Sequence, residues 1–240
     1  MNLDCILSFT TWKGRIYDHN VMLNLMSMLS QKTHYNYKVV LVLSSEEFPN
    51  KEKQIPEDML LISRECPQFE ILWTYRNTRA LKKLNPVMRK YPDIPIMTTD
   101  DDILLKDSAI EQFMNEHQKT PDMILTNPGF VMDGNEVCTG CFRLFPPHSL
   151  AELDDEDFMT YYQGCEDDAW NALRAILGRT HTRIITEYAT ELIENGNQRV
   201  ALANEYHHIP WKERQEAFFK AFPEARMFFD RLVHMKNMRG

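Results

Sequence analysis

The sequence predicts an α/β fold in which helices cover both faces of a mostly parallel, twisted sheet, giving a three-layer α/β/α sandwich. The first supporting observation is a series of short runs with apolar residues at successive positions, as in strands that are covered on both faces. The second is that segments with helical periodicity separate these runs. Strand and helix therefore alternate, and a ligand site is expected beyond the carboxyl ends of the strands.

The expected strands and helices follow from these patterns. The strands are the runs at 5–9, 38–43, 70–73, 94–98 and 123–126. Two helical faces are marked by Val21, Leu25, Met28 and Leu29, and by Leu81, Leu84, Val87 and Met88. Ser108 and Glu111 have the spacing of a capping box, which predicts a helix start at this point and a loop from Thr99 to Asp107.

Length and composition predict one soluble globular domain of 240 residues. No run approaches the roughly 18 apolar residues of a spanning helix, and the N-terminus lacks the pattern of a signal peptide, so a cytoplasmic protein is expected. A net charge of −8 argues against sequence-independent binding to the phosphates of a nucleic acid. The five cysteines are expected to be thiols, because the Cys138–Cys141 pair has no second pair to complete a zinc site.

Three consecutive carboxylates, Asp100, Asp101 and Asp102, follow the predicted strand that ends at Thr98. Adjacent like charges repel, so a site that holds them close needs a cation or strong hydration. Asp100 and Asp102 have the spacing with which Mg²⁺ or Mn²⁺ can bridge to a diphosphate. The alternative is a solvated acidic turn near a helix start.

A second acidic cluster, Glu166, Asp167 and Asp168, stands where a helix is expected to begin. Acidic residues are common at this position because of the helix dipole. Two separate clusters nevertheless allow a division of roles, in which one holds a metal and the other accepts a proton from an attacking hydroxyl.

The chain resembles small bacterial glycosyltransferases of the GT-A fold that are related to glycosyltransferase family 2. Six segments in the family order carry the resemblance: Leu7–Arg15, Leu43–Pro49, Lys82–Pro86 with Tyr91-Pro92, Thr99–Ile103, Thr139-Gly140 with Phe145–Leu150, and Glu166–Trp170. The resemblance implies a nucleotide-sugar-binding half over 1–126, an acceptor and catalytic half over 127–205, and a C-terminal helical tail over 206–240. It departs from the family pattern around Gly140, where glycines are few, and weakens beyond Gly178.

The resemblance also implies roles for individual residues in a metal-dependent, inverting transfer. Donor binding would involve Thr10, Arg15, Asp100 and Asp101, with Lys82 or Lys83 neutralising the diphosphate, unless Arg15 and the lysines are solvated surface residues. Asp102 and Asp100 would hold Mn²⁺ or Mg²⁺. Asp167 would be the catalytic base in preference to Asp168, and Glu166 would orient the acceptor. The donor would be a nucleoside-diphosphate sugar, with UDP favoured, and the acceptor a glycan or glycolipid. The usual setting of the family is the synthesis of a bacterial surface polysaccharide or glycolipid.

Two features near the C-terminus each allow two interpretations. His207, beside His208, resembles a histidine that completes the metal shell in other GT-A enzymes, but adjacent surface histidines are common. The phenylalanine-rich tail from Trp211 is expected to pack on the domain; a contact with another copy or with the inner membrane surface is the alternative.

Two other functional classes stay open at the level of sequence. One is another metal-dependent nucleotide enzyme, such as a nucleotidyltransferase, although only Lys13-Gly14-Arg15 suggests a basic phosphate loop. The other is a non-catalytic sugar-binding or interaction domain on a GT-A scaffold, because a fold does not fix a function.

Overall fold

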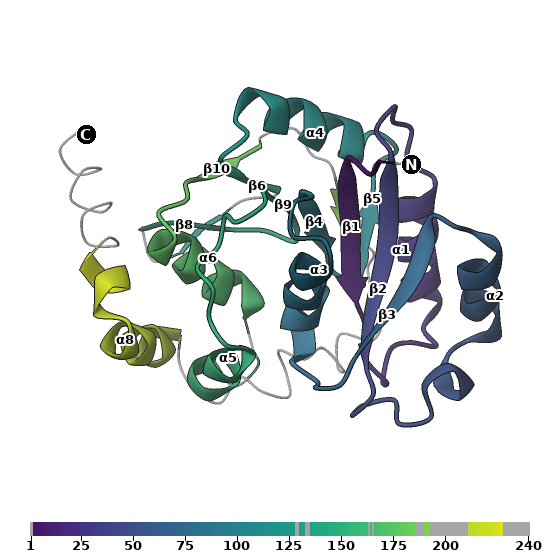
Figure 1. The fold of residues 1–240 in the computed structure, drawn as a ribbon, viewed down its shortest axis with the longest axis horizontal. Helices are drawn as coiled ribbons and strands as arrows, with labels where there is room; N and C mark the ends of the chain where they lie inside the picture. Colours follow the sequence, from purple (N-terminus) through teal and green to yellow (C-terminus); the bar gives the residue numbers. More distant parts are fainter. Residues whose placement is uncertain are drawn as a thin grey trace.

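The computed structural model describes residues 2–127, 130–132, 135–162, 164, 166–185, 190–192 and 211–227 (Figure 1). The strands are β1 Cys5–Thr10, β2 Tyr37–Ser44, β3 Phe69–Thr74, β4 Ile96–Thr99, β5 Ile103–Leu105, β6 Ile124–Asn127, β7 Phe130–Met132, β8 Asn135–Thr139, β9 Phe142–Phe145, β10 Thr182–Ile184 and β11 Thr190–Leu192. The helices are α1 His19–Leu29, η1 Lys51–Gln54, α2 Glu57–Glu65, η2 Arg79–Lys83, α3 Asn85–Lys90, α4 Ala109–Lys119, α5 Asp155–Tyr162, α6 Asp167–Leu177 and α8 Trp211–Ala221.

The main sheet confirms the predicted α/β class. Its strand order is β10-β6-β9-β4-β1-β2-β3, and β9 is antiparallel to its two neighbours while the other pairs are parallel. The chain adds β2 and β3 on one side of β1 and then returns to place β4 on the other side. Such a reversal opens a crevice at the carboxyl ends of the strands, where α/β proteins bind ligands.

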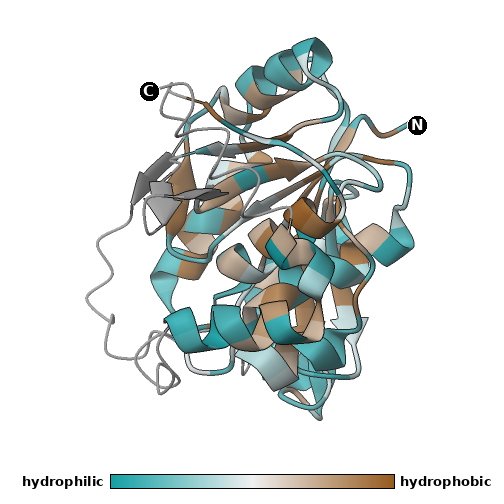
Figure 2. Cartoon of the chain, turned by 90° about the vertical axis from the view of Figure 1, so that its left-hand side faces the viewer, coloured by the Kyte–Doolittle hydropathy of each residue, from teal (hydrophilic) through white to brown (hydrophobic). Residues whose placement is uncertain are grey.

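Both faces of the sheet are buried, which explains the continuous apolar runs. On one face of the sheet, the odd-numbered residues of β1, such as Leu7 and Phe9, pack against α1 and α4. The other face packs Ile6 of β1 and Val40 of β2 against α3 and α6. Figure 2 shows hydrophobic strands inside and hydrophilic residues on the outward faces of the helices.

Two expectations about connecting segments were wrong. The stretch from Thr99 to Asp107 is not all loop, because Ile103 and Leu105 are buried and β5 pairs with β11. The capping box does not form either: the Ser108 hydroxyl accepts a hydrogen bond from Gln112, and the Glu111 carboxylate accepts one from Thr33. The helix still begins directly after Ser108, as predicted.

The segment from Leu81 to Met88 is two short helices rather than one. Leu84, with φ −115° and ψ −64°, separates η2 from α3, and Pro86 stands in the first turn of α3, where a proline is favoured. Lys82 and Lys83, in the last turn of η2, are both buried. The interpretation of these lysines as solvated surface residues is therefore wrong.

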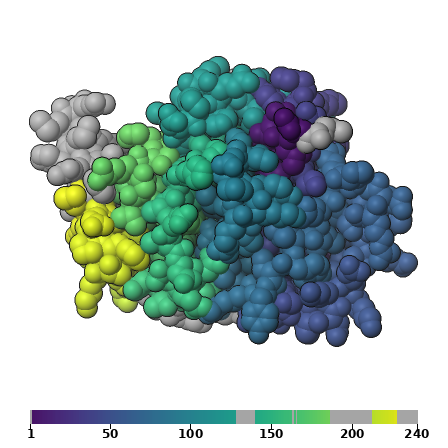
Figure 3. All heavy atoms as spheres, in the orientation of Figure 1, coloured from purple at the N-terminus to yellow at the C-terminus, as the bar shows by residue number. Residues whose placement is uncertain are grey.

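The helix α8 packs on the rest of the protein through Phe218 and Phe219, which are buried in a cluster with Trp170 of α6 and Tyr162 of α5. Figure 3 shows this helix in yellow beside the green segments that carry α5 and α6. None of the described helices is long and apolar enough to cross a membrane.

Candidate active site

A cavity of about 270 Å³ lies at the carboxyl ends of β1, β2, β3 and β4. Its described lining residues are Thr10, Thr11, Trp12, Arg15, Glu47, Asn77, Arg79, Ala80, Lys82, Lys83, Asp100, Asp101, Asp102 and Asp167. The cavity lies at the switch point of the sheet, where the strand order reverses between β1 and β4. This point brings together the loop after β1, the aspartate turn and one carboxylate of the second acidic cluster.

Asp101 anchors the aspartate turn inside the protein. One carboxylate oxygen accepts a 2.6 Å hydrogen bond from Thr11 Oγ1, and the other lies 2.6 Å from Nη1 of Arg15. Both oxygens are thus engaged by protein groups. Asp100 and Asp102, on either side, are only half-buried, and Asp102 Oδ2 lies 3.4 Å from the same Arg15 nitrogen.

The buried side chain of Asn24 on α1 holds the backbone of the aspartate turn. Its Nδ2 donates to the backbone carbonyls of Asp100, at 3.0 Å, and of Ile103. This explains why a polar residue occupies the apolar face of α1.

We predict that Asn24→Ala lowers the free energy of unfolding by about 2 kcal/mol, because it leaves two carbonyl oxygens in the interior without their donor. Urea unfolding followed by circular dichroism measures this change. Met26→Ala, on the exposed side of α1, is the matched control and should change stability by less than about 0.5 kcal/mol. Equal effects of the two substitutions would contradict the assigned role of Asn24.

Five charged residues form a continuous series of ion pairs from the aspartate turn to the second acidic cluster. Lys83 Nζ lies 2.6 Å from Asp100 Oδ1 and 3.1 Å from Asp167 Oδ2. Arg143 Nη2 of β9 lies 3.0 Å from the same Asp167 oxygen and 2.6 Å from Oδ1 of Asp168. Carboxylates and cations therefore alternate from Asp100 to Asp168.

The pKa values of Asp167 and Asp168 are shifted in opposite directions. Burial would raise the pKa of Asp167, but Lys83 and Arg143 outweigh it and lower that pKa. Burial, together with the charge of Asp167, raises the pKa of Asp168 to about 6 although Arg143 opposes the change. Asp167 is thus held ionised, whereas Asp168 gains and loses a proton closer to neutral pH.

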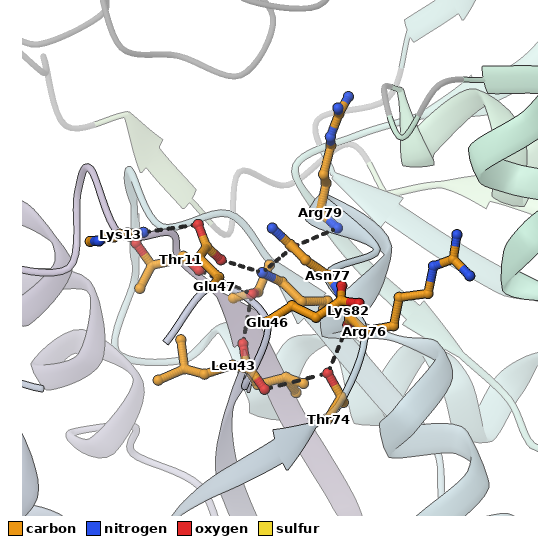
Figure 4. Close-up of polar contacts among 12 residues, drawn as sticks. Thr11, Lys13, Leu43, Glu46, Glu47, Thr74, Arg76, Asn77, Arg79 and Lys82 are labelled. Atoms are coloured by element: carbon orange, nitrogen blue, oxygen red, sulfur yellow. Dashed lines mark hydrogen bonds and ion pairs between the residues drawn. The ribbon is translucent and has the colours of Figure 1, made fainter. Parts of the chain in front are cut away.

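A second polar cluster forms the wall of the cavity at the ends of β2 and β3 (Figure 4). Glu47 accepts a hydrogen bond from the backbone N–H of Lys13 at 3.1 Å and lies 3.0 Å from Nζ of Lys82. The same ammonium donates to Asn77 Oδ1 at 2.8 Å. Burial lowers the pKa of Lys82 although Glu47 opposes the change.

The predicted site residues differ in how they meet the cavity. Thr10 and Arg15 line it, but the Thr10 hydroxyl donates to the carbonyl of Val42 at 2.7 Å, and Arg15 is paired with Asp101. Glu166 is not among the described lining residues; its carboxylate pairs with the buried Arg214 of α8. His207 and His208 lie outside the described residues.

Sequence reasoning missed Asn24, Glu47, Asn77 and Arg143. Arg143 had a visible signal, because it is the only charged residue in the apolar run from Phe142 to Phe145. The others gave none, since their roles depend on contacts with distant segments.

Comparisons with known proteins support the fold. No family model and no curated protein sequence matches the chain. Solved structures do match: S. aureus TarS 1–349 in complex with UDP has a TM-score of 0.56 at 11% identity, over 78% of this chain and 59% of that one. The mannosyltransferase PcManGT from Pyrobaculum calidifontis, in complex with GDP-Man and Mn²⁺, has a TM-score of 0.51 at 13% identity, over 78% and 55%.

A third match is 4-diphosphocytidyl-2C-methyl-D-erythritol synthase, a nucleotidyltransferase, with a TM-score of 0.50 at 12% identity over 82% of this chain and 96% of that one. In contrast to this third match, the chain spans little more than half the length of the TarS and PcManGT chains. At these identities the matches establish the fold, which is the GT-A type, a mixed α/β sandwich with a mostly parallel sheet.

Proposed function

We propose that the protein is a glycosyltransferase that moves a hexosyl group from a nucleoside-diphosphate sugar, with UDP favoured, to a hydroxyl of a glycan or glycolipid. The observation that carries this proposal is the convergence of the aspartate turn, two buried lysines and Asp167 on one cavity at the switch point of a GT-A sheet. We further propose that the chain acts as one domain in the cytoplasm or at the inner membrane surface.

The aspartate turn fits a divalent cation such as Mn²⁺ or Mg²⁺. Asp100 and Asp102 each meet a protein cation through one oxygen in the described residues, and carboxylate oxygen is the ligand such ions prefer. No described group of three or more His, Cys, Asp and Glu side chains is placed to hold an ion alone, so the donor diphosphate would supply further ligands. When bound, the ion would neutralise charge on the departing nucleoside diphosphate.

The charges that line the cavity suit an anionic donor only together with such an ion. Four of the described lining residues are cationic, namely Arg15, Arg79, Lys82 and Lys83, and five are acidic, namely Glu47, Asp100, Asp101, Asp102 and Asp167. A divalent ion would reverse the resulting excess of one negative charge. Lys83, buried between Asp100 and Asp167, is the lysine that we place nearest the diphosphate.

Asp167 is the proposed base. It lines the cavity, its carboxylate is held ionised, and its position in the first turn of α6 makes it rigid. It would accept the proton of the acceptor hydroxyl as the new bond forms at the anomeric carbon. One base and no covalent intermediate imply a single displacement with inversion of configuration.

The nucleotidyltransferase alternative is favoured by one observation, the fold match to an enzyme of that class. The two reactions release different products. We expect the protein to release a nucleoside diphosphate from a UDP- or GDP-sugar with Mn²⁺, and no release after chelation. Pyrophosphate release from a nucleoside triphosphate in the presence of a sugar phosphate would support the alternative. Donor binding without turnover would instead indicate a non-catalytic domain.

A further inference from the structure

Arg143 is a buried cation in the middle of the main sheet. It stands on β9 opposite Thr98 of β4 and Thr126 of β6, and its side chain is 4% exposed. Burying a guanidinium is costly unless it is paired and hydrogen-bonded. Its environment must therefore hold negative charge at a fixed place.

The contacts of Arg143 with the two aspartates differ in kind. Nη2 donates a 3.0 Å hydrogen bond to Asp167 Oδ2, whereas its 2.6 Å approach to Oδ1 of Asp168 lacks hydrogen-bond geometry. The guanidinium also lies over the Phe145 ring, with 5.3 Å to the ring centroid. A side chain stacked in this way is restrained at the point from which it reaches both carboxylates.

We infer that Arg143 is a positioning residue that holds Asp167 and Asp168 together and keeps this carboxylate pair ionised near neutral pH. The inference rests on the proposed function, because it gives the pair its use as proton acceptor. Adjacent carboxylates in one helical turn repel each other, and a cation shared between them removes that repulsion.

The other charges around the pair cannot replace Arg143. Lys83 of η2 faces Asp167 but is shared with Asp100, whose charge also acts on Asp168. Without Arg143, three carboxylates would face one lysine. Asp168 would then lack the cation that it contacts in the described structure, and the pair would hold a proton at neutral pH.

The test compares Arg143→Gln with wild type in two measurements. The first is the pH profile of kcat. Its acid limb reports the uptake of a proton by the Asp167–Asp168 pair, because a proton shared by the pair prevents Asp167 from acting as base. In wild type we expect this limb near the pKa of Asp168, about 6, with activity falling as the pH falls through it. We expect the substitution to move this limb upward by at least about one pH unit, since an opposite charge at this distance shifts a carboxyl pKa by roughly 1–3 units. The KM for the donor should change little.

The second measurement is the titration of aspartate carboxyl ¹³C signals, which needs no substrate. An upward shift of the Asp167–Asp168 titration in Arg143→Gln would support the inference even if the protein transfers no sugar. Transfer by wild type with an unmoved titration would overturn the inference and leave the proposed function standing.

Arg174→Gln is the matched control. Arg174 is equally buried, but its described hydrogen-bond partners are the neutral oxygens of Ala151, Asn85 and Asn171. We expect the control to lower the melting temperature without moving the acid limb. Arg143→Lys should shift the limb by less than Arg143→Gln, because a lysine reaches one carboxylate, and it carries the test if Arg143→Gln does not fold. An unmoved limb in Arg143→Lys, or an equal shift in Arg174→Gln, would refute the inference.

Discussion

Asp167→Asn is expected to reduce sugar transfer by at least about a hundredfold, which is the lower end of the contribution of a positioned general base. The acceptor hydroxyl attacks well only if its proton leaves as the new bond forms, and an amide cannot accept that proton. Donor and metal affinity should be retained, because the aspartate turn keeps its anchor on Arg15 and Thr11. Single-turnover transfer and calorimetric titration with the donor separate these two effects.

The fold should survive this substitution, since Lys83 keeps Asp100 and Arg143 keeps Asp168 as ionic partners. Circular dichroism and the melting temperature provide the check. Asp168→Asn is the neighbouring control, and we expect a smaller loss because Asp168 is not among the described residues that line the cavity. Near-normal transfer in the Asp167 and Asp168 double variant would disprove the assignment, as would a product with the anomeric configuration of the donor.

Asp102→Asn is expected to abolish the metal-dependent part of donor affinity and to lower transfer by at least about a hundredfold, because a bound metal contributes several kcal/mol of charge stabilisation. An amide is a weaker ligand for a hard cation than a carboxylate. The melting temperature should remain near wild type, since the main partner of Arg15 is Asp101 rather than Asp102, at 2.6 Å against 3.4 Å. Calorimetry with a UDP-sugar, with and without Mn²⁺, measures the effect.

Asp107→Asn is the matched control for metal binding. Asp107 lies at the other end of β5 from Asp102, and its side chain is exposed and pairs with the surface residue Lys32. This substitution should leave Mn²⁺-dependent donor affinity unchanged. Unchanged Mn²⁺-dependent affinity in Asp102→Asn would rule out Asp102 as a metal ligand, whereas equal losses in both variants would indicate a general effect of negative charge.

The sequence by itself determined the class of the fold and the position of two acidic clusters. Apolar runs covered on both faces predicted a parallel sheet because every residue of such a strand is buried, and this periodicity is a local property. The same reasoning placed the aspartates directly after β4 and the second cluster at the start of α6. Local patterns predict where an element begins and which side chains its ends carry.

Only the tertiary structure decided which charged residues meet. Arg143 and Asp167 are 24 positions apart, and Arg15 and Asp101 are 86 apart, so no local pattern relates them. The same holds for Lys82: the sequence left open whether this lysine is solvated or lies near the donor, and the structure buries it beside Glu47. Burial is what gives these charges their partners and their pKa shifts, and burial depends on how the strands are ordered in the sheet.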